Sequence, residues 1–93
     1  MMNPEVVTIG LGYIGLPTSA LIASHGTHVL GVDINQKIVD TINQGKIHIV
    51  EPDLDQIVSK AVSSGFFKAS TTASPAEVYL VVVPTPFKEN HEP

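Results

Sequence analysis

The sequence predicts an α/β domain built on a parallel β-sheet. Short β-branched apolar segments alternate along the chain with segments of helical spacing, which is typical of parallel strands joined by crossover helices. The first two helical segments end at Gly26 and Gly45, and helices commonly end at glycine. The 93 residues are 43% hydrophobic and 15% charged, so one folded domain is expected over residues 1–93.

Four strands are expected, each a short apolar run bounded by turn-forming residues. They cover residues 5–9, 27–32, 66–70 and 78–83. The first run meets a glycine cluster, as a buried parallel strand that leads into a tight turn does. Right-handed crossovers then place the fourth strand beside the first. The expected sheet order is therefore 3-2-1-4, a Rossmann-type parallel sheet that is truncated after its fourth strand.

Three helices are expected, over residues 13 or 14 to 25, 35 to 44, and 54 to 64. Residues that share a face are expected to point at the core: Leu16, Ala20 and Ala23 in the first helix, and Ile34, Ile38 and Ile42 in the second. Asn35 is expected to cap the second helix. Ser74 and Glu77 have capping-box spacing, which predicts one helical turn at 74–77.

A glycine-rich motif lies between the first strand and the first helix. Residues 10–15 read Gly10-Leu11-Gly12-Tyr13-Ile14-Gly15 and match G-x-G-x-x-G in the structural context that this motif requires. Gly10 permits a sharp turn, Gly12 lets a diphosphate approach the backbone, and Gly15 lets the helix pack closely on the strand. The free N–H groups of the helix start then face the phosphates. Taken alone, the hexapeptide is equally compatible with a turn that binds nothing.

An acidic residue stands where a dinucleotide site needs one. Asp33 ends the second strand, 18 residues after Gly15, and its carboxylate is placed to accept hydrogen bonds from the adenosine ribose hydroxyls. The alternative is a helix-capping or surface acid. The carboxylate would repel a ribose 2'-phosphate and the chain contains no Arg, so NAD is expected rather than NADP. Lys37 is the one nearby cation that could weakly offset this repulsion of a 2'-phosphate. A solvated lysine on the helix surface is the simpler interpretation.

The fourth strand ends in Val83-Pro84-Thr85-Pro86, at the carboxyl edge of the sheet beside the switch point. Two prolines stiffen this turn. Thr85 is a candidate to hydrogen-bond the cofactor, and a plain exit turn is the alternative. Residues 88–93 are polar and are expected to form a loose tail.

Composition argues against several classes of function. With a net charge of −4 and no Arg, the chain has no basic stripe for nucleic acid or anionic membranes. No apolar run is long enough to span a bilayer, and the absence of Cys fits a cytoplasmic protein. The four His residues lack metal-ligand spacing, and Asp53 and Asp55 are interpreted as helix-dipole partners. No metal site and no catalytic residue are expected.

The segments GLGYIGLPTSA, GVDINQKIVDTINQGKIHIVEPDL and VPTPFKENHEP resemble the N-terminus of the UDP-glucose/GDP-mannose dehydrogenase family over nearly the whole chain. This family oxidises the hydroxymethyl carbon of a nucleotide sugar to a carboxylate, with NAD as hydride acceptor. The resemblance assigns the phosphate-binding loop to residues 10 and 12–15, the ribose acid to Asp33 and a cofactor contact to Thr85. Many relatives carry a basic residue where this chain has Ile38, so neighbouring Lys37 would have to replace it.

The resemblance also implies what these residues lack. The family's catalytic cysteine and the residues that bind the UDP-sugar lie downstream of the matched region, so the 93 residues are expected to bind nucleotide weakly and without turnover. The apolar edge of the fourth strand is expected to pair with a second copy in a homodimer. Two other classes of function use a glycine turn followed by an acid: a nucleotide-sensing module and an S-adenosylmethionine-dependent methyltransferase.

Overall fold

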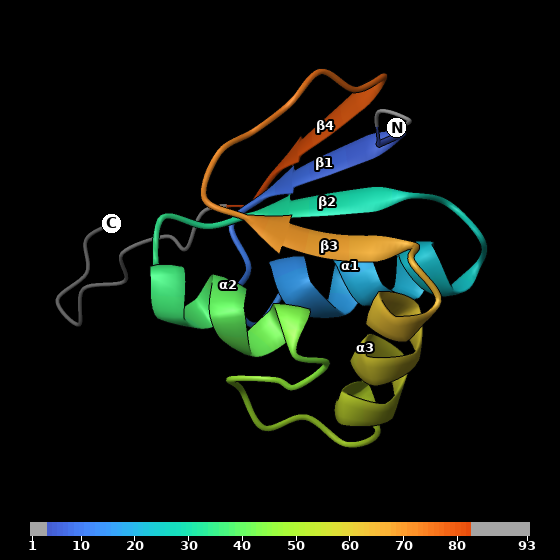
Figure 1. Ribbon diagram of the computed structural model, residues 1–93, viewed down its shortest axis with the longest axis vertical. Coiled ribbons are helices and arrows are strands. Elements are labelled where there is room, and N and C mark those ends of the chain that lie inside the picture. The colour runs from blue at the N-terminus through green and yellow to red at the C-terminus, as the bar shows by residue number, and fades with distance from the viewer. Residues whose placement is uncertain (1–3, 83–93) are drawn as a thin grey trace, which may run out of the picture.

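The computed structural model describes residues 4–82, which form a four-stranded parallel sheet in the order β3-β2-β1-β4 (Figure 1). The strands are β1 (Val6–Ile9), β2 (Val29–Val32), β3 (Phe67–Ser70) and β4 (Val78–Val81). The helices are α1 (Gly15–Ser24), α2 (Gln36–Asn43) and α3 (Leu54–Ser63). The predicted fold class and strand order are therefore confirmed.

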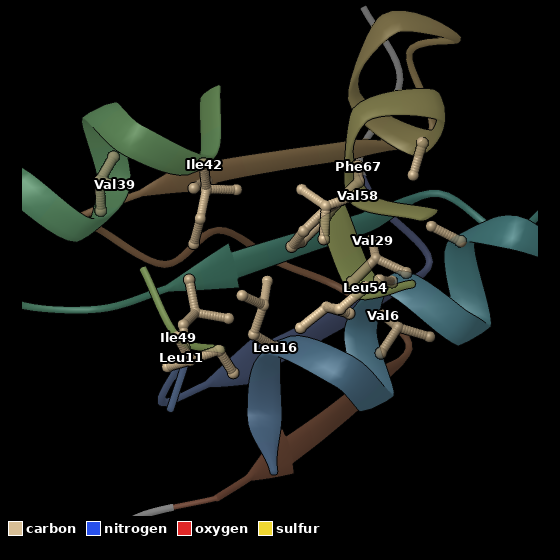
Figure 2. Close-up of a cluster of buried hydrophobic side chains, with 14 residues drawn as sticks. Val6, Leu11, Leu16, Val29, Val39, Ile42, Ile49, Leu54, Val58 and Phe67 are labelled. Atoms are coloured by element: carbon tan, nitrogen blue, oxygen red, sulfur yellow. The ribbon is translucent and has the colours of Figure 1, made fainter. Parts of the chain in front are cut away.

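All three helices lie on one face of the sheet (Figure 1). This follows from the right-handed crossovers, because β1 to β2 and β2 to β3 step in the same direction across the sheet. The main core fills the space between sheet and helices, with Leu16, Ile42 and Val58 fully buried (Figure 2). A smaller cluster of Val7, Leu30 and Val32 lies apart from it. The residues described thus bury one face of the sheet under helices.

One predicted core residue is wrong. Ile34 is 94% exposed, and α2 instead buries Val39 and Ile42. The reason is that α2 begins only after Asn35, whose backbone is extended and whose side chain accepts hydrogen bonds from the amides of residues 37 and 38. Ile34 therefore precedes the helix, and helical spacing does not apply to it. Ile38 is half-buried against the core, as expected.

The helical turn predicted at 74–77 does not form. The strand order requires the chain to pass from β3 across two strands to β4, and residues 73–76 make this crossing without regular structure. The hydroxyl of Tyr79 holds the crossing in place, since it donates to the Ser74 carbonyl at 2.8 Å and accepts from the Ala76 amide at 3.1 Å. Tertiary contacts replace the local capping pattern here.

The two edges of the sheet differ. At β3, the side-chain amide of Asn43 accepts from the Ala69 amide at 2.8 Å and donates to the Ala69 carbonyl at 2.9 Å. At β4, Val78, Tyr79 and Val81 are exposed. Within residues 4–82, the edge of β3 is thus partly closed by a side chain, whereas the outer edge of β4 is open.

Candidate functional site

The glycine turn at the carboxyl end of β1 is tightly folded, and two of its glycines are required by the chain itself. Gly10 has φ +103, and a Cβ there would lie 1.8 Å from the carbonyl oxygen of Val82. A Cβ at Gly15 would lie 1.8 Å from the carbonyl oxygen of Gly10. The Gly10 amide also donates to Val32 at 2.8 Å, which ties the turn to the end of β2. Side chains at either glycine would open the turn.

Gly12 differs from the other two glycines. A Cβ at this position would meet nothing within 4 Å, and its backbone is not in the left-handed region. No contact within residues 4–82 therefore calls for glycine at residue 12. Close approach of an outside group such as a diphosphate to the main chain is the reason that the glycine motif predicts for this position.

The start of α1 offers unused hydrogen-bond donors. Ile14 occupies the cap position and its side chain makes no capping hydrogen bond. The amides of Gly12, Tyr13 and Ile14 donate no hydrogen bond within residues 4–82. The side chains of Tyr13 and Ile14 are 70% and 67% exposed. Free amides at the positive end of a helix dipole fit phosphate oxygens.

Asp33 lies directly beside this turn. Its Oδ2 accepts a hydrogen bond from the Leu11 amide at 3.0 Å, and its Oδ1 accepts one from the Asn35 amide at 3.0 Å. Each carboxylate oxygen has two lone pairs, so both retain capacity for a further donor such as a ribose hydroxyl. The sequence predicts that Asp33 and the turn come together, but neither amide contact was part of that prediction.

The remaining candidate residues of the predicted site are Lys37 and Thr85. Lys37 is exposed in the first turn of α2, and in the part of the chain that the structure describes its side chain forms no ion pair. Ile38, at the position where many relatives carry a basic residue, packs its side chain against the core. This side chain is therefore not available to contact a ligand. Thr85 lies outside the described residues. Val82, which precedes the segment of Thr85, lies beside the turn, since its amide donates to the carbonyl of Ile9 at the end of β1 at 2.7 Å.

A cavity of about 600 Å³ lies away from the glycine turn, between β2, β3 and the crossing at 72–74, and none of the predicted site residues lines it. In residues 4–82, no three acidic or histidine side chains group as a metal site would need. No helix in that range has the length and hydropathy to cross a membrane.

Comparison with known proteins matches this arrangement to a family. The model of the UDP-glucose/GDP-mannose dehydrogenase family, NAD binding domain, matches residues 4–93. The chain belongs to this family. The matched region is the family's NAD-binding domain, and its cofactor is NAD. The uncapped helix start, the open side of Gly12 and the adjacent Asp33 all fit that cofactor.

Individual members of the UDP-glucose/GDP-mannose dehydrogenase family are closely similar. The UDP-N-acetyl-D-mannosamine dehydrogenase of Escherichia coli K12 is 61% identical over all 93 residues, which cover 22% of that protein. The NDP-N-acetyl-D-galactosaminuronic acid dehydrogenase of Ralstonia nicotianae is 58% identical over 95% of this chain and 21% of its own length. The chain thus spans about a fifth of the length of these relatives.

Solved structures agree. The UDP-N-acetyl-mannosamine dehydrogenase of Staphylococcus aureus superimposes with a TM-score of 0.86 at 47% identity, over 91% of this chain and 21% of that chain. The GDP-mannose dehydrogenase of Pseudomonas aeruginosa, solved as a ternary complex, gives 0.85 at 32% identity, over 95% of this chain and 21% of that chain. The sheet and helices described above are therefore the architecture of these dehydrogenase domains.

Proposed function

We propose that this chain is the NAD-binding portion of a UDP-sugar 6-dehydrogenase, with UDP-N-acetylmannosamine as the sugar nucleotide of the whole enzyme. The choice of sugar rests on the 61% identity to the mannosamine enzyme over all 93 residues. In such an enzyme NAD accepts hydride from the sugar's hydroxymethyl carbon. We propose that the whole enzyme is cytoplasmic and supplies sugar acids for polysaccharide synthesis.

The observation that supports cofactor binding by this chain is the contact between Asp33 and the glycine turn. The 3.0 Å hydrogen bond from the Leu11 amide holds the carboxylate next to the bare main chain at Gly12. We propose that the amides of residues 12–15 bind the diphosphate and that Asp33 accepts the hydroxyls of the adenosine ribose. Lys37 and Thr85 are proposed as further contacts, near the adenine and at the end of the fourth strand.

The same carboxylate supports selectivity for NAD over NADP. A 2'-phosphate would lie against Asp33, and the chain contains no Arg that could neutralise it. Lys37 provides the only cation close in sequence, four residues after Asp33 on an exposed helix turn. We expect NADP to bind at least about tenfold more weakly than NAD.

We further propose that these 93 residues do not turn over substrate on their own. They contain no cysteine, and the covalent chemistry implied by the family resemblance requires a thiolate nucleophile. The UDP-sugar is proposed to bind residues of the whole enzyme that this chain does not contain. Binding of NAD is expected to be weak, because half of the crevice is contributed from elsewhere in the domain.

Isothermal titration calorimetry with NAD, ADP-ribose, NADP and nicotinamide mononucleotide tests the proposal. NAD and ADP-ribose are expected to bind with similar affinity, because the retained elements surround the adenosine diphosphate half. Nicotinamide mononucleotide is expected to give no heat, and neither is the UDP-sugar when it is titrated as a fifth ligand. Absence of any signal with NAD and ADP-ribose at about 1 mM ligand would contradict the proposal, since that concentration corresponds to only about 4 kcal/mol of binding free energy.

Asp33→Asn is the diagnostic variant for this titration. Loss of the charge removes the strong acceptor of the ribose hydroxyls, so NAD affinity should fall about tenfold or more. Asp55→Asn is the matched control, because it makes the same charge change in the first turn of α3. Equal affinities in the two variants would exclude the assigned role of Asp33.

We also propose that these 93 residues, on their own, form a homodimer through β4. Its outer edge is open in the residues described, and Val81 is 68% exposed there. The amides of Val78 and Val82 donate to the carbonyls of Glu5, just before β1, and of Ile9, so by strand alternation those of residues 79 and 81 point to the open edge. A second copy of this strand would satisfy them.

A further inference from the structure

A glycine in the middle of β2 is explained by one side chain of the glycine turn. A Cβ on Gly31 would lie 2.7 Å from Cδ2 and 3.0 Å from Cδ1 of Leu11, and 3.0 Å from a ring carbon of Phe67. The backbone of Gly31 is not in the left-handed region, so its conformation does not require glycine. The space that a Cβ would take is filled by the Leu11 side chain. Glycine inside a strand marks such a close approach.

Leu11 therefore connects two parts of the candidate site. Its side chain is fully buried between sheet and helices, among the core residues of Figure 2. Its amide donates to Oδ2 of Asp33 at 3.0 Å. Gly31 lies in β2 and Asp33 directly follows the last residue of that strand, so the side chain of Leu11 packs on the strand that leads to the acid.

We propose that Leu11, seated on Gly31, is a positioning residue that sets the spacing between the diphosphate-binding turn and the ribose-binding carboxylate. This inference rests on the proposed function. The side chain is anchored in a packed core, where shifts of a few tenths of an ångström are resisted. Because the side chain is fixed, the Leu11 amide stays in place and holds the Asp33 carboxylate in one orientation. In that orientation an acceptor lone pair is directed at the ribose.

An ordinary core leucine would behave differently. Its truncation would lower stability but leave the contribution of Asp33 to binding unchanged. A positioning residue must instead show energetic coupling to Asp33, and a double-mutant cycle measures that coupling.

The experiment compares the NAD affinity lost on Asp33→Asn in two backgrounds, wild type and Leu11→Ala. The proposal expects a loss of about tenfold in wild type and of less than about threefold with Leu11→Ala, because Asp33 is no longer held in place. Leu54→Ala is the matched control background. It removes the same atoms from the same core, at the start of α3, and should preserve the full loss. Equal losses in all three backgrounds would overturn the inference.

Hydrogen exchange gives a readout that needs no ligand. The amide of residue 11 donates to Asp33 and is protected by that hydrogen bond. After allowance for any change in global unfolding, Leu11→Ala should speed hydrogen exchange at this amide about tenfold or more. Leu54→Ala should not. Unchanged protection would overturn the positioning role even if NAD binds. Conversely, faster exchange in a chain that shows no NAD binding would leave the positioning of Asp33 intact and refute the proposed function.

Smaller substitutions cover the case in which Leu11→Ala does not fold. Leu11→Val shortens the side chain and should reduce the coupling to Asp33 in the same direction. Gly31→Ala should push Leu11 outward and weaken NAD binding by about threefold or more, and Leu11→Val in the same chain should restore part of that loss. If the double variant binds no better than Gly31→Ala alone, the seat of Leu11 on Gly31 does not control the site.

Discussion

Glycine at residue 12 separates a requirement of folding from a requirement of binding. Gly12 has open space on the side of a Cβ and an ordinary φ. Gly12→Ala should leave the free energy of unfolding unchanged or raise it by about 0.4–1 kcal/mol, because alanine restricts the unfolded chain. NAD affinity should nevertheless fall about tenfold or more, since the methyl group occupies the approach of the diphosphate. Urea unfolding and calorimetry on one preparation measure both quantities.

Gly26→Ala is the control for this experiment, because Gly26 also has open space but adopts φ +91. That variant should lose stability and keep its affinity for NAD. If Gly12→Ala bound NAD as tightly as the wild type, no diphosphate would approach the main chain at residue 12.

Asp53 carries backbone strain that glycine would remove. It has φ +64 at the start of α3, the one described non-glycine residue with positive φ, and its side chain makes no capping hydrogen bond. Asp53→Gly should raise the free energy of unfolding by about 0.5–1 kcal/mol in urea titrations. Asp55→Gly, inside the same helix, should lower it by about 1 kcal/mol. A loss of stability in Asp53→Gly would mean that its carboxylate does more for α3 than the contacts show.

At the scale of elements, Asn43 joins the end of α2 to the edge of β3. Its two hydrogen bonds to Ala69 replace those of a neighbouring strand. Asn43→Ala should cost about 1–3 kcal/mol, because the Ala69 amide and carbonyl lose their partners in a partly buried setting. It should also speed hydrogen exchange at residue 69. The matched control is Gln36→Ala, which removes an exposed 2.9 Å contact to Asp40 within α2 and should cost less than about 0.5 kcal/mol.

A result in which both variants lost the same small amount of stability would contradict a docking role for Asn43.

The same elements show where local patterns predict well. The cap at Asn35 and the stops at Gly26 and Gly45 follow from residues adjacent in sequence, and the structure has each of them, with positive φ at both glycines. The turn expected at 74–77 fails because the crossing to β4 is a long-range demand.

For the whole molecule, the open edge of β4 predicts association. Light scattering should show a fraction of dimer that rises with protein concentration. The reason is that parallel or antiparallel addition of a strand satisfies the outward amides of β4. Val81→Lys should shift the chain to monomer, since a charge at this exposed position opposes strand pairing. Leu21→Lys makes the same charge change at an exposed site on α1 and should leave the dimer intact. A wild-type chain that stays monomeric at high concentration would refute the homodimer.

The sequence by itself determined the alternation of strands and helices, the order of the sheet, and the approach of Asp33 to the glycine turn. These follow from periodicity, from crossover handedness and from the rule that parallel strands end at a common edge. The roles of Gly10, Gly12, Tyr13, Ile14, Gly15, Asp33, Lys37 and Thr85 in binding stay predictions.

Only the tertiary structure decided which glycines serve the fold and which is free for a ligand, because that depends on atoms distant in sequence, such as the carbonyl of Val82 against Gly10. It also placed Val39 rather than Ile34 in the core, partly closed the β3 edge with Asn43 and packed Leu11 on Gly31. Periodicity describes a single element, whereas these contacts arise where elements meet. A glycine within a strand was the sequence signal for the last of them.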